Sequence, residues 1–573
     1  MRLLNCVLLT LMTTVTSTLA QPTTTIRARD LALKSSGAVS GTDWKLAGNG
    51  YVGTYVKLSA PGTLAVVVEA SVAPAPADAK APPSHVNVVV ADSSFGIDLA
   101  QRDFKKFEHG FDLPAGTYFV RVERTSTTKG AGSDVTFRSI GFRGASVLNE
   151  HSDANALAAA ETYTENFRRG PATVKLAGVQ PGAEVRVKLK RHAFSFGTAV
   201  AGFDKNELLI DNPPPDSDPA KYQHAIETHF NAIVPGNAGK WAYNEKDRDV
   251  VTMGYIDQII QYARRHNMRM RMHTMLWDTG QQPEWVRDLL TKAAAGDTAA
   301  RDELRRQISE RIGYFVHDRA GAYDELDVLN EALHQPRYLK VFGIDGIAQI
   351  YAEAARAVAD AGASTKLYVN EFNIFQWSQL PPPLGDKEKW DPYANWYREH
   401  AEALRAAGGT VGGIGVQYYV NPDPSLAQPH SAARIFGVLQ NLSVGGFRIT
   451  LTEFGAKTGA DESLTADALE HTLRLVFGTP QAAGFMMWGI WETEMWDQAL
   501  GAAFYTRDWK LRKPGERFER LMKEWDTDLT LKSGDDGAVN FTGFFGDYEI
   551  TAGDKVFPCT LAKGTTKYDV SSK

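Results

Sequence analysis

Short apolar runs alternate with longer helical patterns from residue 194 onward in this chain of 573 residues. The runs have the length and composition of buried strands, and they cover residues 194–200, 230–234, 268–276, 325–329, 366–370, 411–417, 447–452 and 484–488. Helical patterns lie between or after them, at residues 255–266, 301–316, 347–360, 396–407, 431–442, 466–477 and 513–525. Eight strands that alternate with helices are typical of a (β/α)8 barrel. We therefore predict a TIM barrel over residues 192–527.

The region before the barrel, residues 21–146, has the composition of a β-sandwich. Val-rich runs at residues 64–68, 86–90 and 118–122 are separated by Gly and Pro turns. A proline-rich segment at residues 73–83 is expected to be a loop within this domain. The sandwich is a candidate carbohydrate-binding module, and its aromatic residues are equally consistent with sugar stacking and with a structural core. These residues are Trp44, Tyr51 and Tyr55.

Two further segments flank the barrel. Residues 147–191 are predicted to be a connector, with a helix at 157–167 and a hairpin whose strands, 172–176 and 184–189, surround the turn at 180–182. Residues 528–573 return to β-type composition and are predicted to be a C-terminal extension that pairs with this hairpin. The fold class is therefore multidomain, with a β-sandwich before a TIM barrel and β-strands after it.

Charge and leader composition limit the partners and the location. The net charge is −6 and no long basic block is present, so nucleic acid and anionic membranes are poor candidate partners. Residues 1–20 combine Arg2, an apolar run and the end Thr18-Leu19-Ala20, which is typical of a secretory signal. After its removal Cys559 would be the single cysteine, so no intramolecular disulfide can form. We expect a secreted monomer, extracellular or periplasmic.

Two glutamates follow predicted strands of the barrel directly. Glu331 comes after Asn330 at the end of the fourth run, and Glu453 after Thr452 at the end of the seventh. Strand ends on one face of a barrel converge, so both side chains are expected to face one cleft. Either glutamate alone would more often be a salt-bridge partner, but the pair favours catalysis. Glycosidic cleavage uses one carboxylic acid and one carboxylate, about 5 to 5.5 Å apart when the anomeric configuration is retained.

Motifs in a fixed order extend this pattern over residues 192–526. The chain resembles glycoside hydrolase family 10, whose best-known members are endo-β-1,4-xylanases, retaining enzymes built on a (β/α)8 barrel. Each motif alone is weak, and their order and spacing together are specific. They are Phe196-Gly197-Thr198-Ala199-Val200, Asn237 with Lys240-Trp241, His273-Thr274-Met275-Leu276-Trp277, Val328-Leu329-Asn330-Glu331-Ala332, Tyr368-Val369-Asn370-Glu371-Phe372-Asn373, Gly413-Ile414-Gly415-Val416-Gln417, Thr452-Glu453 and Trp488-Gly489.

The resemblance implies roles for individual residues. Glu331 would be the general acid/base and Glu453 the nucleophile, with Asn330 bound to the 2-hydroxyl of the sugar at the cleavage site. We expect His273 and Gln417 to donate hydrogen bonds that keep the nucleophile ionised. Aromatic faces and polar groups would line the sugar-binding subsites, with Asn237, Lys240, Trp277, Trp488 and Trp496 as candidates. Of the other tryptophans, Trp241 and Trp285 are assigned to the core, and Trp491 remains open between core and site.

Four positions depart from the family pattern. Gly236 replaces a carboxylate that binds the second sugar, Asp278 and Tyr419 each replace a histidine, and Phe372 replaces a tyrosine. Tyr419 is retained as a substrate-binding candidate. Asp278 adds negative charge near two carboxylates and would need a compensating cation, for which the candidates are Arg271 and Arg337.

The sequence therefore predicts a secreted, retaining endo-glycosidase that cleaves internal β-1,4 linkages of xylan or a related hemicellulose. We expect no cofactor and no metal, because no Gly-rich phosphate loop opens a helix and pairs such as Glu494-Met495 lack ligand spacing. Two alternatives stay open. The same barrel could act on a different β-linked polysaccharide, as a hydrolase or a transglycosylase, or it could be a catalytically impaired carbohydrate-binding protein.

Overall fold

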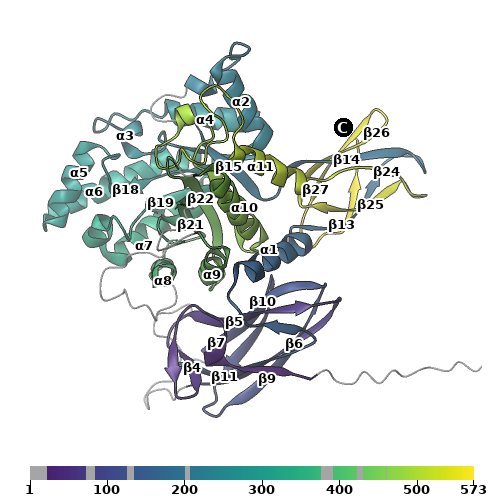
Figure 1. The fold of residues 1–573 in the computed structure, drawn as a ribbon. Coiled ribbons are helices and arrows are strands. Elements are labelled where there is room, and N and C mark those ends of the chain that lie inside the picture. The colour runs from purple at the N-terminus through teal and green to yellow at the C-terminus, as the bar shows by residue number, and fades with distance from the viewer. Residues whose placement is uncertain are drawn as a thin grey trace, which may run out of the picture.

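The computed structural model describes residues 22–72, 84–125, 134–200, 207–375, 392–421, 430–459 and 461–572. The predicted signal and the proline-rich loop at 73–83 lie outside the described residues. Figure 1 shows a central barrel with an N-terminal β-sandwich below it and a smaller β unit beside it. Among the described residues, no helix combines the length and the apolar character needed to cross a membrane.

The predicted barrel strands form a closed parallel sheet, which confirms the (β/α)8 prediction. The strand order is β17-β16-β15-β23-β22-β21-β20-β19-β18, and pairing of β17 with β19 closes the ring. The third predicted run is divided in two, and both pieces pair with β19. The strands are β15 Ser195–Val200, β16 Ala232–Pro235, β17 Arg269–Met272, β18 Leu276–Trp277, β19 Glu325–Asn330, β20 Lys366–Glu371, β21 Gly413–Val420, β22 Arg448–Ala456 and β23 Ala482–Met487.

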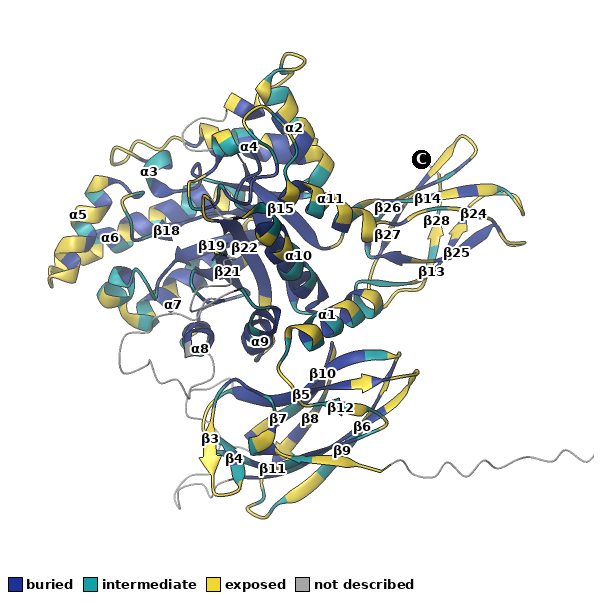
Figure 2. Ribbon diagram, viewed as in Figure 1, coloured by how far each residue is buried: buried dark blue, intermediate teal, exposed yellow. Residues whose placement is uncertain are grey.

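Helices cover the outside of this sheet, so the strands are buried on both faces (Figure 2). Several of these helices have a side-chain cap at their N-terminus. Asp461, for example, accepts from the backbone N–H groups of Ser463 and Leu464 at the start of α10. The helices are α2 Asp218–His229, α3 Trp241–Asn244, α4 Gly254–Arg265, α5 Glu284–Ala294, α6 Thr298–Arg311, α7 Arg337–Asp360, α8 Pro392–Ala406, α9 Ala432–Leu442, α10 Glu462–Gly478 and α11 Lys513–Glu524.

The N-terminal region is a sandwich of two sheets, as predicted. One has the order β3-β4-β11-β6-β9 with β1 beside β11, and the other the order β12-β5-β10-β7-β8 with β2 beside β5. The strands are β1 Thr24–Arg27, β2 Leu33–Lys34, β3 Ala38–Ser40, β4 Asp43–Leu46, β5 Gly50–Leu58, β6 Gly62–Val72, β7 Ser84–Val90, β8 Ser93–Leu99, β9 Lys105–Leu113, β10 Gly116–Thr125, β11 Val135–Arg143 and β12 Ser146–Leu148.

The three aromatic residues of the sandwich are buried, so of the two roles left open the core role is the observed one. Trp44, Tyr51 and Tyr55 are 7%, 2% and 0% exposed, and none of them presents a ring face to solvent on which a sugar could stack. The Tyr55 ring packs 5.5 Å from Phe436 of barrel helix α9.

The sheet that contains β5 and β10 is joined to the barrel. Phe119 packs edge-on against Phe436 at 5.5 Å, and Arg121 donates to the Gln440 side chain at 2.7 Å. Helix α1, Asp153–Phe167, lies between the two parts and contacts α9, α10 and β10. Its residue Tyr163 accepts a 2.8 Å hydrogen bond from the Phe119 N–H. The sandwich therefore shares a packed interface with the barrel.

The smaller β unit corrects one prediction. The predicted hairpin strands, β13 Arg169–Leu176 and β14 Glu184–His192, lie in different sheets and do not pair with each other. Both pair with the C-terminal segment, as expected: β13 with β25 and β28, and β14 with β24 and β26. Alternating apolar residues suit a hairpin and two facing sheets equally, so the pattern could not separate them. The C-terminal strands are β24 Asp528–Lys532, β25 Ala538–Phe544, β26 Gly546–Ala552, β27 Lys555–Leu561 and β28 Lys567–Val570.

Candidate active site

A pocket of about 540 Å³ lies at the carboxyl ends of the barrel strands. It brings together both predicted catalytic glutamates and every predicted substrate-binding residue except Asn330. The lining residues are Ala199, Val200, Gly236, Asn237, Lys240, His273, Trp277, Gln281, Glu331, Phe372, Gln417, Tyr419, Glu453, Trp488, Gly489, Glu494 and Trp496.

Glu331 follows β19 directly, and its side chain is held by two donors. The indole N–H of Trp277 donates to Oε2 at 2.8 Å, and the amide of Gln417 donates to Oε1 at 3.0 Å. The backbone of Glu331 has a φ of 55°, in the left-handed region that non-glycine residues rarely adopt. Its N–H still bonds the Asn370 carbonyl at 2.8 Å, which anchors the turn to the neighbouring strand β20.

Burial raises the pKa of Glu331, because the charged carboxylate loses water, and the charge of Glu371 adds to this effect. The hydrogen bonds from Gln417 and Trp277 oppose the shift by stabilising the ionised form. A carboxyl group whose pKa lies above its usual range can hold a proton at moderate pH and release it to a leaving oxygen. This is the property that a general acid requires.

Glu453 lies within β22 beside Gln417 of β21 and is 4% exposed. Burial raises its pKa, a hydrogen bond from the Tyr419 hydroxyl lowers it, and the Glu331 charge raises it further. We expected His273 and Gln417 to donate to Glu453, and that expectation was wrong. Gln417 donates to Glu331, and Nδ1 of His273 lies 3.0 Å from Asp327. Tyr419, from the same strand as Gln417, is the donor that reaches Glu453.

Lys240 provides a positive charge in the pocket. Its Nζ donates to Asn237 at 2.7 Å and to Gln281 at 2.9 Å, and it lies 5.0 Å from the centre of the Trp277 ring. Burial lowers the pKa of Lys240, and the charge of Glu453 opposes that shift. Sequence reasoning missed Gln281. Its position soon after Trp277, in the segment that follows β18, was the available signal.

Asn330 is fully buried beneath the pocket and is absent from its wall. Its Oδ1 accepts from Asn370 at 2.9 Å, whereas its Nδ2 has no hydrogen-bond partner among the described residues. A buried amide donor without a partner costs free energy, which a ligand hydroxyl would recover. The contact between Asn330 and a sugar hydroxyl therefore stays a prediction, and the unpaired Nδ2 group of Asn330 supports it.

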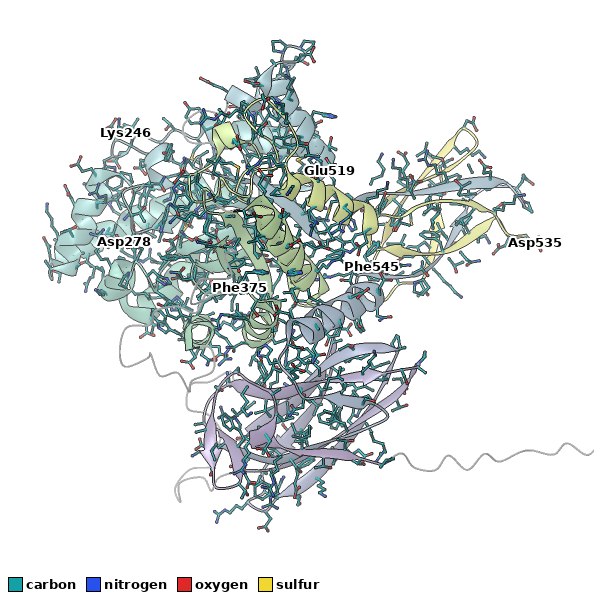
Figure 3. The ribbon with its side chains drawn as sticks, viewed as in Figure 1. Lys246, Asp278, Phe375, Glu519, Asp535 and Phe545 are labelled. Atoms are coloured by element: carbon teal, nitrogen blue, oxygen red, sulfur yellow. The ribbon has the colours of Figure 1, made fainter. Side chains whose placement is uncertain are left out.

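A buried ionic cluster lies below His273. Arg271 donates to Glu325 at 2.5 Å and also pairs with Asp327, which contacts His273. Burial lowers the pKa of His273 and so favours the neutral ring, although the hydrogen bond and charge of Asp327 oppose the shift. Because Arg271 is engaged here, the cation beside Asp278 is the other candidate: Nε of Arg337 lies 2.9 Å from that carboxylate. Figure 3 marks Asp278 on the barrel.

The tryptophans divide between the site and the core. Trp488 and Trp496 line the pocket, and Trp496 is 45% exposed at its rim. Trp241 is buried and packs edge-on against Trp285 at 5.6 Å, in agreement with the core assignment. Trp491, which the sequence left open, is 4% exposed and stacks on Trp509 at 4.6 Å, so it belongs to the core.

A second carboxylate supports the turn that carries Glu331. Glu371, at the end of β20, accepts from the Leu333 N–H at 2.6 Å, and its other oxygen lies 2.5 Å from Nδ1 of His334. The His334 ring stacks on Phe372, a pocket residue, at 4.0 Å. The sequence placed Glu371 within a motif but gave it no role, because its partners belong to the segment after a different strand.

Comparisons with known proteins agree with this architecture. The model of "Glycosyl hydrolase family 10" matches residues 188–512. Anti-sigma-I factor RsgI6 of Acetivibrio thermocellus is 29% identical over 375 residues, 64% of this chain and 42% of that protein. Endo-1,4-beta-xylanase 1 of Arabidopsis thaliana is 24% identical over 392 residues, 67% of this chain and 36% of that protein.

This chain therefore spans less than half the length of these two curated relatives. Among solved structures, xylanase 10B from Thermotoga petrophila RKU-1 in complex with xylobiose shares 18% identity at a TM-score of 0.46 and covers 58% of this chain and 94% of its own. The family model covers more than half of the chain, and its range includes every barrel strand. The chain belongs to glycosyl hydrolase family 10.

Proposed function

We propose that this protein is a secreted, retaining endo-1,4-β-xylanase that acts on xylan or a closely related hemicellulose. The observation that carries the proposal is that Glu331 and Glu453 line one pocket, with Gln417 next to both of them. Gln417 donates to Glu331 and lies beside Glu453 in the strand register. The xylan substrate is supported by relatives that are named endo-1,4-beta-xylanases, and secretion by the composition of residues 1–20.

In the first step, the Glu453 carboxylate attacks the anomeric carbon while the bond to the leaving oxygen breaks. Glu331 donates its proton to that oxygen, and a glycosyl ester of Glu453 forms. In the second step, Glu331 removes a proton from water, which attacks the same carbon and releases Glu453. Two inversions return the product to its starting anomeric configuration. The raised pKa of Glu331 suits its role as the acid.

The surrounding residues orient these two carboxyl groups and the sugar. Trp277 and Gln417 hold Glu331, and the Tyr419 hydroxyl holds one oxygen of Glu453 so that the other is free to attack. Trp488 and Trp496 offer apolar faces to sugar rings. Lys240 and Asn237 offer polar groups to hydroxyls, which suits a neutral polysaccharide.

The proposal is tested with a panel of polymers and the anomeric form of the first product. We expect reducing-sugar release from xylan to exceed release from mixed-linkage β-glucan and from mannan, and early products observed by NMR to be β-anomers. Faster release from glucan or mannan would identify a different β-linked substrate, an outcome that Gly236 in the pocket wall makes worth testing. Polymer binding without any release would identify a carbohydrate-binding protein. Early α-anomers would exclude the retaining mechanism.

A further inference from the structure

Glu494 is a third glutamate in the pocket, and no role was predicted for it. It ends the short helix η5, Glu492–Glu494, in the segment between β23 and α11 that also carries Trp496. Its side chain lines the pocket and is partly buried. Among the described residues, its carboxylate has no hydrogen-bond or ion-pair partner, whereas a buried carboxylate is normally paired.

The neighbouring glutamate shows the contrast. Glu492 lies 3.2 Å from Nη1 of Arg512 and accepts a 3.1 Å hydrogen bond from the Arg507 N–H, and it does not line the pocket. Arg512, the nearby cation, therefore pairs with Glu492. Burial raises the pKa of Glu494, and the charge of Glu207 adds to this shift, which agrees with the lack of a cation near it in the described part of the chain.

The pocket as a whole carries an excess of acidic groups. Three of the described lining residues are glutamates, namely Glu331, Glu453 and Glu494, and Lys240 is the one lysine or arginine among them. Burial lowers the pKa of His273, which disfavours a positive charge on its ring. The ammonium group of Lys240 donates hydrogen bonds to the neutral amide oxygens of Asn237 and Gln281.

We propose that Glu494 is a specificity-determining residue, whose carboxylate accepts hydrogen bonds from hydroxyl groups of a neutral glycan and disfavours chains that carry uronic acid side groups. The inference rests on the proposed function and narrows its substrate class. A hydroxyl donor supplies the partner that the carboxylate lacks, and a charge-assisted hydrogen bond of this kind is stronger than a neutral one. A uronate would instead bring a like charge into a cleft where solvent screening is weak.

The test compares wild type with Glu494→Gln, which keeps the side-chain shape and removes the charge. The substrates are a linear xylo-oligosaccharide and the same backbone with one glucuronic acid side group. We expect the ratio of kcat/KM for the acidic substrate to that for the neutral one to rise about tenfold in the variant at low salt. The rise should shrink at about 1 M salt, where the Debye length falls to about 3 Å.

Glu549→Gln is the matched control. Glu549 is exposed on β26 in the C-terminal unit, so this variant makes the same change in net charge away from the pocket. It should leave the ratio unchanged. An equal rise in the control, or no rise in Glu494→Gln, would overturn the inference.

A binding measurement separates this inference from the proposed function. Both oligosaccharides are titrated into wild type and Glu494→Gln, with the fluorescence of the pocket tryptophans as the signal. Wild type that binds the neutral oligosaccharide but does not cleave it would refute the proposed function alone. The inference would then stand if the variant still binds the acidic oligosaccharide relatively more tightly, and it would fail if the two proteins show the same preference or if neither binds either ligand.

Discussion

The proposed roles of Glu331 and Glu453 differ, and this difference predicts different losses of activity when each residue is substituted. Glu331→Gln removes the proposed proton donor, so activity on xylan should fall about 10²- to 10⁴-fold. Aryl glycosides with acidic phenol leaving groups need little protonation and should lose much less in the first step. Glu453→Gln removes the proposed nucleophile and should abolish turnover of both substrate types.

The measurement is kcat/KM for xylan and for two aryl xylobiosides whose phenols differ in acidity. Glu310→Gln, an exposed change on α6, serves as the control and should retain full activity. Circular dichroism should show a native fold for all three variants. Equal losses on both aryl substrates in Glu331→Gln would contradict its role as the acid.

The single negative charge of Glu371 should influence the pKa of Glu331, the proposed acid. Its negative charge raises the pKa of Glu331, so Glu371→Gln should lower that pKa and move the alkaline limb of the pH profile of kcat/KM to lower pH. The side-chain oxygen that accepts from the Leu333 N–H is kept, so the turn should stay in place. Glu353→Gln, on α7, makes the same charge change and should leave the limb where it is. If the alkaline limb does not move in Glu371→Gln, Glu371 does not set the pKa of Glu331.

Tyr419 should affect the acidic limb of the pH profile of kcat/KM. Its hydroxyl donates to Glu453 and lowers the pKa of that carboxyl, so Tyr419→Phe should raise the pKa and move the acidic limb to higher pH. The loss of one hydrogen bond to a charged group, about 1.5 to 3 kcal/mol, corresponds to a fall of about 10- to 150-fold in kcat/KM. Tyr418→Phe on the adjacent position, which faces His430 instead, controls for the loss of a hydroxyl. A profile with both limbs unmoved would contradict the assignment.

At the scale of elements, helix α9 links the sandwich to the barrel. Phe436 contacts Tyr55 and Phe119 of the sandwich, so Phe436→Ala should lower the free energy of unfolding by about 3 to 5 kcal/mol. Val39→Ala, at a position that is 61% exposed, should change it by less than about 0.5 kcal/mol. Denaturant unfolding followed by tryptophan fluorescence checks both values. A variant with wild-type stability would show that this contact is not formed in solution.

The elements also show why some predictions succeeded. Barrel strands are buried on both faces and are rich in apolar residues, so their positions could be predicted within a few residues of the observed ends. The hairpin failed for a different reason. β13 and β14 are adjacent in sequence and alternate correctly, but each gains its hydrogen-bond partners from strands more than 300 residues away. Local periodicity carries no information about such partners.

At the scale of the whole molecule, the sandwich is expected to stabilise the barrel. A chain that lacks residues 22–148 would expose Phe436 and Tyr163 and leave Gln440 without Arg121. We expect this chain to unfold at a lower temperature than the full protein and to hydrolyse short soluble oligosaccharides more slowly. Calorimetry and oligosaccharide assays measure both effects. Unchanged melting and turnover with weaker retention on insoluble xylan would instead favour an independent carbohydrate-binding module.

The residue pattern was enough to predict the barrel, the order of the strands that carry the site, and the convergence of Glu331 and Glu453 on one pocket. These follow from short-range patterns, because a strand-helix repeat places the end of every strand on one face. Three features of the site depend on the folded structure: which donors reach which carboxylate, the ion pair of Arg337 with Asp278, and the position of Glu494 in the pocket with no partner among the described residues. Side chains from separate loops meet there, and their approach depends on the packing of the whole chain rather than on spacing along it.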